Sequence, residues 1–419
     1  MSIEQQRGLP SRRTFMVTAA TATAALSAHA QAVEPLRIGL VGTGSRGCDL
    51  LSKLLTIDDI HVAAICDDYP PHLVNGQSIA GANPKAYDRF DSMLEDTALD
   101  AVIIATPLHT HYAMSVAAIE RGLPVFCEKT MCHTIDEAKR LAALVTERNA
   151  IFQVGLQRRG NAIYDQAIAM IHTGMLGTVT TIKCQWHRND NWRKKVPVDT
   201  GHPDFNALER KLNWRLYWAS SQGLMGELGS HQLDVVNRAL GVPPSRVIAM
   251  GGVDYWRDGR EVYDNVFCTY EYNAPNAGEG KPQTVHVAFS SIQTNAHEGM
   301  SELIMGTKGT LLLSQKLGLF YSEVVPAALA VDGLSGATLA VPNSPWAHRG
   351  KPMEITSAAD DTRAELLSFV QAVRASNRKT ICDVRVGLEN TATIIIANEA
   401  IRSGSVVTFP NDCRADAHA

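Results

Sequence analysis

Short apolar runs alternate with helix-like segments in the part of the chain that follows residue 33. The runs at 36–42, 61–66 and 100–106 are rich in Val, Ile, Leu and Ala, as is typical of strands buried on both faces of a parallel sheet. Between them, apolar residues recur at helical spacing, for example over 50–55. This alternation predicts a doubly wound parallel sheet of the Rossmann type over residues 33–153.

The alternation stops after residue 153. Longer strand-like runs follow without helices between them, at 178–188, 245–256, 265–272, 284–293 and 301–315. They predict a C-terminal α+β domain over residues 154–405 with a large, mostly antiparallel sheet. Two helices, expected at 362–376 and 388–403, follow a Pro-, Gly- and Ala-rich loop at 324–361, and 406–419 is a polar tail.

The first 32 residues have the three parts of an export signal. Arg12 and Arg13 precede a mild apolar run at 17–27, and the small-x-small sequence Ala-His-Ala occupies 28–30. The run is too short to span a bilayer, which needs about 20 residues. It therefore predicts a removable twin-arginine (Tat) signal, a periplasmic or otherwise exported protein, transient contact with the Tat translocon, and no stable membrane insertion. An ordinary amphipathic first helix is the alternative, but it leaves the arginine pair unexplained.

The composition argues against nucleic-acid binding and against a disulfide framework. The chain has 419 residues and a net charge of −4, so it has no basic field for nucleic acid. Its eight cysteines are scattered without a CxxC pair, and several of them, Cys66, Cys127, Cys184 and Cys268, lie in strand-like runs. Cys413, in the polar tail, is expected to be an exposed free thiol.

The sequence GTGSRG follows the first predicted strand and opens the first helix. In this position Gly42 allows a tight turn, Gly44 lets the backbone approach a pyrophosphate, and Gly47 lets the helix pack closely on the strand. Ser45 and Arg46 belong to the same turn. The motif predicts a dinucleotide site with phosphates at a helix N-terminus.

The cofactor preference is predicted by Asp67, twenty residues beyond Gly47 and at the end of the second strand. A carboxylate there binds the hydroxyls of an adenosine ribose and repels a 2′-phosphate, which favours NAD. Arg46 and a second acid, Asp68, keep NADP open as an alternative.

Three stretches, GTGSRG, ATPLHTHYAMSVAAIERGLPVFCEKT and MGTKGTLLL, resemble the glucose-fructose oxidoreductase, inositol dehydrogenase and MocA (Gfo/Idh/MocA) family, almost throughout the chain after the signal. The resemblance implies that Lys129, following Glu128, approaches the nicotinamide and the reacting hydroxyl. It also implies a homodimer or homotetramer built on the open face of the second sheet.

A second run matches the family's cofactor-binding Thr-Pro sequence. Thr106, Pro107 and His111 keep that pattern, whereas Leu108 replaces the family's asparagine. In the lysine motif, Thr130 replaces the usual proline.

The sequence GELGSHQLD contributes the other catalytic candidates. Glu227 and His231 are four residues apart, so a regular helix would place them on one face. The carboxylate would then raise the basicity of the imidazole. His231 is assigned as the base and Lys129 as the stabiliser of the oxyanion, or the reverse; a buried core histidine and a helix-dipole role for Glu227 are alternatives. No third ligand of clear spacing supports zinc, so no metal is expected.

Aromatic and polar residues gather at 185–193 and 212–218. Flat aromatic faces suit the C–H faces of sugar rings, and neighbouring polar groups suit hydroxyls. Core or dimer contacts are the alternative for any single tryptophan, and a salt-bridged hinge is the alternative for Arg158. The substrate candidates are Arg158, Trp186, His187, Trp192, Arg193, Trp214 and His231.

These features together predict an NAD(P)-dependent sugar or polyol oxidoreductase. Outside the cytoplasm free NAD is scarce, so the cofactor is expected to be tightly bound and reused. An NAD-dependent glycoside hydrolase acting by transient ring oxidation is the alternative, and a non-catalytic sugar-binding module is a third hypothesis.

Overall fold

The computed structural model describes residues 34–414 except 82, 276–281, 324–352 and 358–359. The predicted signal, most of the predicted loop and the last five residues of the predicted tail lie outside the described residues. Within the described part of the chain, no helix combines the length and the apolar character needed to cross a membrane.

The first domain is built on a parallel six-stranded sheet with the order β3-β2-β1-β4-β5-β6. Its strands are β1 (Leu36–Val41), β2 (Ile60–Cys66), β3 (Lys85–Tyr87), β4 (Ala101–Ile104), β5 (Val125–Glu128) and β6 (Phe152–Gly155). Its helices are α2 (Ser45–Leu54), α3 (Pro70–Ala80), α4 (Phe90–Asp96), α5 (His111–Glu120) and α6 (Ile135–Glu147). The strand order reverses between β1 and β4, and the carboxyl ends of strands beside such a reversal form a crevice for ligands. The predicted doubly wound sheet is confirmed.

The second domain contains a nine-stranded sheet in which only the central β7–β10 pair is parallel. The predicted mostly antiparallel sheet is thereby confirmed. Its strands are β7 (Val179–His187), β8 (Arg246–Gly252), β9 (Asn265–Ala274), β10 (Gln283–Ile292), β11 (Met300–Gly306), β12 (Gly309–Leu313), β13 (Leu317–Ser322), β14 (Met353–Thr356) and β15 (Val407–Thr408). Helices α7 (Ala162–His172), α9 (Ser230–Leu240) and α11 (Val384–Ser403) lie against one face, and a π-helical turn (Met225–Gly229) leads into α9.

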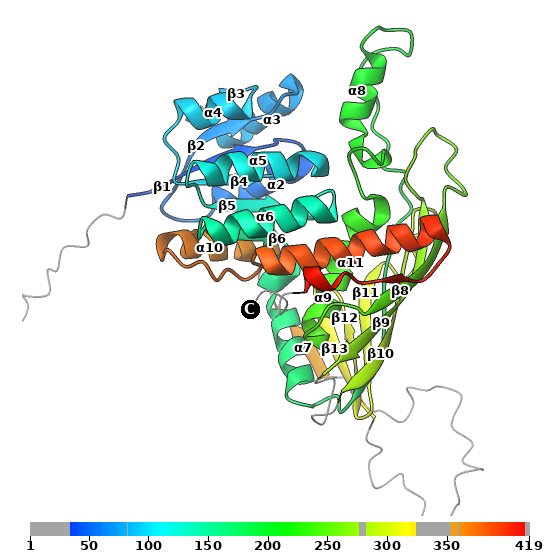
Figure 1. Ribbon diagram of the computed structural model, residues 1–419. Coiled ribbons are helices and arrows are strands. Elements are labelled where there is room, and N and C mark those ends of the chain that lie inside the picture. Colours follow the sequence, from blue (N-terminus) through cyan, green and yellow to red (C-terminus); the bar gives the residue numbers. More distant parts are fainter. Residues whose placement is uncertain (1–33, 82, 276–281, 324–352, 358–359, 415–419) are drawn as a thin grey trace, which may run out of the picture.

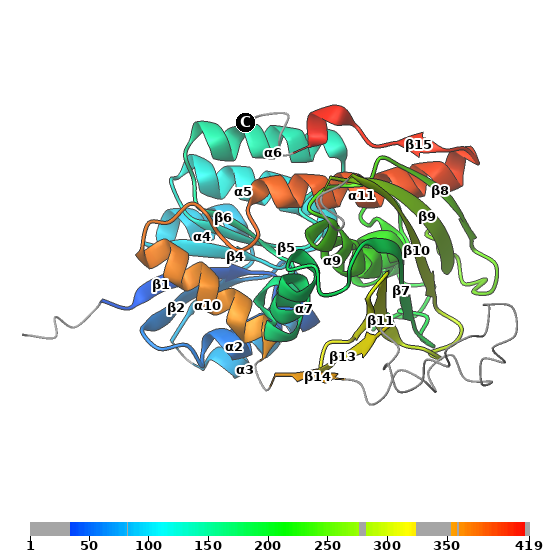
Figure 2. The ribbon, with the colours of Figure 1, turned by 90° about the horizontal axis from the view of Figure 1, so that it is seen from below.

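Two helices from the last part of the chain bind the domains together (Figures 1 and 2). Helix α10 (Asp361–Arg374) returns to the first domain and packs beside α2, where Leu366, Phe369 and Val370 join the apolar layer under the parallel sheet. Helix α11 lies along α6 and α9.

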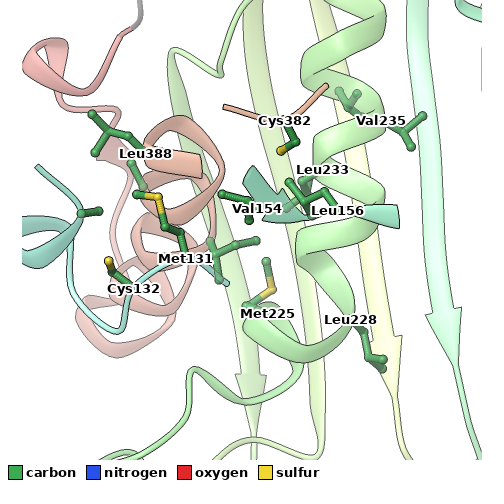
Figure 3. Close-up of a cluster of buried hydrophobic side chains, with 14 of the residues drawn as sticks. Met131, Cys132, Val154, Leu156, Met225, Leu228, Leu233, Val235, Cys382 and Leu388 are labelled. Carbon is green, nitrogen blue, oxygen red and sulfur yellow. The ribbon is translucent and has the colours of Figure 1, made fainter. Parts of the chain in front are cut away.

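An apolar cluster fills the junction that α11 covers (Figure 3). Met131, just after β5, and Val154, in β6, pack there with Met225 from the π-helical turn and Leu388 from α11. Burial of each such side chain contributes about 1.5–3 kcal/mol. The loop that carries Lys129 is therefore held directly against the second domain.

Two expectations about the C-terminal region are wrong in detail. Helix α11 begins four residues before the predicted 388, because the Asp383 side chain accepts the N–H groups of Arg385 and Val386 and so caps the helix. The segment that begins the predicted tail belongs to the second sheet, because β15 pairs with β8.

Cys413 is buried, not exposed as expected. Phe409 lies in the core four residues earlier, and Asp412 is ion-paired at 2.5 Å with Lys139 on α6. These two contacts hold the segment against the body of the protein. Burial raises the pKa of the Cys413 thiol to about 11, so the thiol is protonated at neutral pH.

Candidate active site

A cleft of about 560 Å³ opens at the carboxyl ends of the first-domain strands. The first domain contributes the glycine turn, Asp67, Thr106, Pro107 and Lys129 to its wall. The opposite wall comes from the second domain and consists of Lys194, Arg210, Lys211, Leu212, Trp214, Arg215, Tyr217, Ala219, Ser220 and Glu227. One cleft therefore joins the predicted cofactor residues to the predicted catalytic residues Lys129 and Glu227.

The glycine turn fits a bound pyrophosphate. Gly42 has a φ of +90°, and a Cβ atom there would lie 2.5 Å from the Ala105 carbonyl oxygen. A Cβ at Gly47 would lie 1.7 Å from the Gly42 carbonyl oxygen, whereas the nearest atom to one at Gly44 is 3.6 Å away. Gly44 thus leaves room for a ligand. No side chain caps the N-terminus of α2, so its N–H groups, next to Ser45, are available to phosphate oxygens.

Arg46 connects the glycine turn to β5, α2 and α10. Its guanidinium donates to Glu128 at 2.6 Å, Asp49 at 2.7 Å and Glu365 at 2.9 Å. Burial alone would lower the pKa of Arg46, but Glu128 and Glu365 outweigh it and raise the pKa. Arg46 lines the cleft, yet its guanidinium is bound to these carboxylates and is not a free partner for a 2′-phosphate.

Asp67 is held as an ionised acceptor at the end of β2. Its carboxylate accepts the N–H groups of Thr43 at 2.7 Å and Tyr69 at 2.9 Å. Burial would raise the pKa of Asp67, but His72 and the two N–H groups lower it overall. This is the arrangement expected for an acid that binds a ribose diol.

His111 connects the ends of two strands. Its Nδ1 lies 2.9 Å from the Thr130 carbonyl oxygen and its Nε2 lies 3.0 Å from the Thr106 carbonyl oxygen. Its side chain is buried, and burial lowers its pKa. His111 therefore ties the segment after β4 to the segment after β5, and it also lines the cleft.

Hydrogen bonds hold both the backbone and the side-chain amino group of Lys129. Its backbone N–H donates to the Glu128 carboxylate at 3.1 Å, and its Nζ donates to the Glu227 carbonyl at 3.0 Å and the Gly226 carbonyl at 3.3 Å. Burial lowers the pKa of Lys129, and Glu227 and Glu128 oppose that effect only partly. The ammonium group faces the cleft and is able to exchange a proton more readily than a surface lysine.

The expected effect of Glu227 on His231 is wrong. The Glu227 carboxylate accepts from Arg215 Nε at 2.7 Å and lies 3.8 Å from Lys129 Nζ. The chain is a π-helix at this point, so residues four apart do not superpose as they would in an α-helix. Burial, followed by the positive charges of Lys129 and Arg158, lowers the pKa of His231 well below its usual value, and the imidazole is neutral at pH 7.

The structure separates the predicted substrate residues into two groups. Trp214 lines the cleft, whereas Trp186 and the buried His231 are not among the residues that line it; their rings lie 5.6 Å apart. Arg158 is instead ion-paired with Glu302 in the core of the second domain. His187 is turned to Ser290, with 2.9 Å between Nε2 and Oγ.

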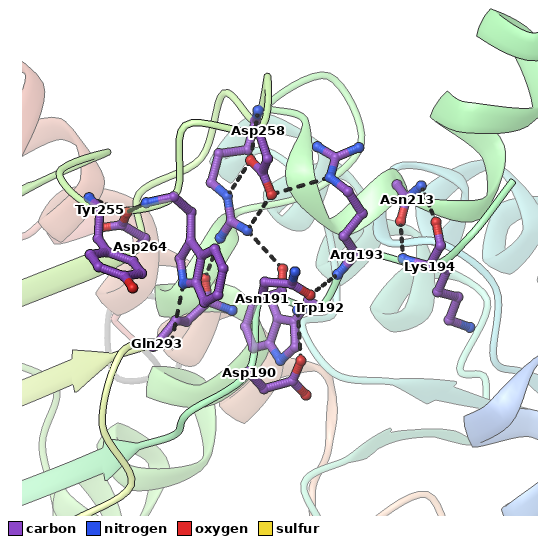
Figure 4. A network of polar contacts seen from close by, with 12 residues as sticks. Asp190, Asn191, Trp192, Arg193, Lys194, Asn213, Tyr255, Asp258, Asp264 and Gln293 are labelled. Carbon is purple, nitrogen blue, oxygen red and sulfur yellow. Dashed lines mark hydrogen bonds and ion pairs between the residues drawn. The ribbon is translucent and has the colours of Figure 1, made fainter. Parts of the chain in front are cut away.

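Trp192 and Arg193 belong to a polar network behind the cleft (Figure 4). Arg193 binds Asp258 at 3.1 Å and is also paired with Glu209. This network holds the loop after β7 in place; neither residue is among those that line the cleft.

Sequence reasoning missed the cations on the second-domain wall of the cleft. Lys194, Lys211 and Arg215 all lie there. The sequence does show Lys and Arg concentrated at 193–195 and 210–215. The tryptophans of the same segment suggest sugar binding more directly and draw attention away from these cations. Among the described residues, no group of three or more His, Cys, Asp or Glu side chains is placed to hold a metal ion.

Family models match both domains of this architecture. The oxidoreductase family model with an NAD-binding Rossmann fold matches residues 36–156, and the model of that family's C-terminal alpha/beta domain matches residues 168–409. The chain belongs to the Gfo/Idh/MocA oxidoreductase family. Its first domain is thus an NAD-binding domain, and the chain is an enzyme.

Curated members of the Gfo/Idh/MocA family are similar mainly over the first domain. Inositol 2-dehydrogenase 4 of Saccharopolyspora erythraea is 34% identical over 158 residues, which are 37% of this chain and 46% of the relative. The rhizopine catabolism protein MocA of Rhizobium meliloti is 32% identical over 151 residues, 36% of this chain and 47% of the relative. The matched part of the chain spans about half the length of these curated relatives.

Solved Gfo/Idh/MocA structures extend the likeness to both domains. Levoglucosan dehydrogenase in complex with NADH and levoglucosan superposes with a TM-score of 0.69 at 18% identity, covering 90% of this chain and 100% of that chain. The WlbA dehydrogenase of Bordetella pertussis, in complex with NADH and UDP-GlcNAcA, gives 0.65 at 19% identity, covering 90% and 99%. At this identity the likeness shows a shared fold.

Replacing Asp67 by Asn should shift the cofactor preference toward NADP. The substitution keeps the shape of the side chain and removes the charge that repels a 2′-phosphate, so the ratio of NADPH to NADH affinity should rise about tenfold or more. Fluorescence titration with both cofactors measures the ratio. Asp91→Asn, on the exposed start of α4, is the control; an unchanged ratio in Asp67→Asn would mean that another residue selects the cofactor.

Proposed function

We propose that this enzyme transfers a hydride between a hydroxyl-bearing carbon of a sugar or polyol and a tightly retained nicotinamide cofactor. The observation that carries the proposal is the position of Lys129, which shares one cleft with the glycine turn and the second-domain wall. The inositol and levoglucosan dehydrogenases among its relatives support a polyhydroxylated substrate.

The reaction breaks a C–H bond and an O–H bond of the substrate and leaves a carbonyl group. Bound NAD⁺ supplies the acceptor for the hydride. The Lys129 ammonium stabilises the oxygen as its proton leaves. Neutral His231 is the proposed proton acceptor, and the two roles are exchanged if Lys129 itself is the base.

Replacing Lys129 by Met should lower kcat about 10²–10³-fold while NAD remains bound. The glycine turn holds the phosphates independently of this ammonium group. Single-turnover reduction of bound NAD by a panel of sugars and polyols measures the chemical step, and titration measures binding. Near-normal turnover would contradict the role of Lys129. Release of an aglycone from a glycoside without any carbonyl acceptor would support the NAD-dependent glycoside hydrolase instead.

The pH profile distinguishes the two assignments of the base. Because the pKa of His231 is lowered well below 6.5, a histidine base is already neutral at pH 6.5, and kcat/KM should be flat from there to about pH 8. Activity should fall only at lower pH, as the imidazole becomes protonated. A steady rise of kcat/KM through and above neutral pH would identify Lys129 as the base. Burial lowers the pKa of Lys129 from the high value usual for lysine, so the fraction of neutral amine would still increase over this range.

Cofactor retention is supported by an arm of the second domain that covers the adenosine end of the cleft. Helix α8 (Phe205–Leu212) projects from the second domain toward α3 (Figure 1). At its end Lys211 is ion-paired with Asp68, 2.9 Å away on the first domain. Asp68 adjoins the proposed ribose acceptor Asp67, so a bound dinucleotide would lie beneath this contact.

Retention is consistent with the proposed export through the twin-arginine pathway. A chain that folds around NAD before export carries its cofactor with it, and each hydride taken from a sugar must then be returned to a second carbonyl compound. The proposed catalytic cycle is therefore ping-pong.

A homodimer or homotetramer is supported by the outer face of the second sheet. Ile248, Met250 and Phe267 on adjacent strands β8 and β9 are 52%, 75% and 53% exposed. A second copy of the chain would remove this apolar surface from water.

Replacing Lys211 by Met should accelerate release of NAD about two- to fivefold, the range expected for one partly exposed ion pair. Stopped-flow fluorescence with NADH measures the dissociation rate. Lys139→Met is the matched control, because the Lys139–Asp412 pair is similarly exposed but lies outside the cleft. Asp68→Asn should have the same effect, and the double variant should add nothing; equal rates in wild type and Lys211→Met would contradict the retaining role of the arm.

A further inference from the structure

One cation near the proposed catalytic groups has no counterion. Arg188, just beyond β7, stacks on the Trp186 ring at 5.0 Å. Among the described residues no carboxylate lies within ion-pair distance of its guanidinium and no side-chain hydrogen bond is formed by it. Its neighbours in sequence and space differ in this respect: Arg158 is paired with Glu302, and Arg193 with Glu209 and Asp258.

The strand places Arg188 on the side of the proposed reaction. Side chains two apart in a strand share a face, and Ile182 and Cys184 are buried on the face covered by α9. Trp186 continues that face to His231, 5.6 Å away between ring centres. Arg188 follows with the same periodicity, and its guanidinium carbon lies 5.0 Å from the centre of the Trp186 ring.

The charge in this region is not balanced by the protein. Lys129 and Arg215 share the single carboxylate of Glu227. Burial lowers the pKa of Arg188, the charges of Asp190 and Glu227 oppose this in part, and the charge of Arg215 lowers it further; burial and Arg215 also lower the pKa of Lys194. A partly buried cation with which no carboxylate pairs directly is stabilised by an anion bound beside it. The pyrophosphate of a cofactor does not supply this anion, because the glycine turn holds it in the first domain.

We propose that Arg188 binds a carboxylate carried by the substrate, and that the substrate is a sugar acid, an aldonate or a uronate. This inference rests on the proposed hydride transfer and specifies its substrate class. The planar guanidinium matches a carboxylate in a two-bond geometry, and its stacking on Trp186 holds it in position.

The test compares charged and neutral ligands on the NAD-loaded enzyme. D-Gluconate and D-glucuronate are measured against D-glucitol and D-glucose, by quenching of tryptophan fluorescence and by reduction of bound NAD. The wild type should bind the acids at least tenfold more tightly, as expected for a charge-assisted hydrogen-bonded pair. Arg188→Gln should abolish the difference without changing the neutral ligands, and Arg188→Lys should keep part of it.

Arg140→Gln, an exposed arginine of α6, controls for the change in net charge. Equal affinity of the wild type for acids and neutral sugars, or equal weakening of both in Arg188→Gln, would overturn the inference; so would tighter binding of glucose 6-phosphate than of either carboxylate. If the acids bind through Arg188 but no ligand reduces NAD, the carboxylate site stands and the proposed hydride transfer is wrong.

Discussion

The loop that carries the proposed catalytic Lys129 is tied to the glycine turn by one partly buried ionic contact, between Arg46 of that turn and Glu128 of β5. Glu128 in turn accepts the backbone N–H of Lys129. Glu365, from α10, completes the cluster; burial, opposed by Arg46, raises its pKa above the usual value. Arg46 thus contacts three acidic side chains, Glu128, Glu365 and the more exposed Asp49. A buried pair of this kind adds little net stability, since desolvation offsets attraction, but it links the phosphate turn, the lysine and the C-terminal helix in a single arrangement.

Much of the first domain could be predicted because its signals are local. Gly42, Gly44 and Gly47 act through the backbone of one turn, and Asp67 follows at a spacing that the strand–helix–strand unit itself imposes. The second sheet could also be predicted, because its long strand-like runs follow one another without helices between them. What the sequence concealed were contacts between distant segments. Cys413 was misjudged because its polar neighbours hide the burial of Phe409.

The catalytic half of the site was only partly predictable for the same reason. Lys129 was found from its motif, but the partner of Glu227 depends on a π-helical turn that no periodicity in GELGSHQLD discloses. Arg158 is ambiguous in sequence because it follows a strand end, where a substrate-facing residue and a salt-bridged one look alike, and Arg193 because it lies in a tryptophan-rich run. Their carboxylate partners, Glu302 and Asp258, lie 144 and 65 residues away. Conversely, the lack of an ion-pair partner at Arg188 can be recognised only from the three-dimensional positions of the side chains around it.

One segment of the second domain joins the two ends of the cleft. It begins at Arg188 beside Trp186, passes through α8, where Lys211 meets Asp68, and returns to the cleft wall at Arg215. The parts of this segment before and after α8 are joined by a hydrogen bond, in which the Lys194 backbone N–H donates to the Asn213 side chain at 2.6 Å (Figure 4). The end of the cleft at Asp67 and Asp68 is acidic, and the end at Lys129 and Arg215 is basic. Because the same segment carries Arg188 and Lys211, the proposed substrate site and the proposed contact over the cofactor are parts of one element. If substrate binding changes the affinity for the cofactor through this segment, the cofactor must change the affinity for the substrate by the same factor.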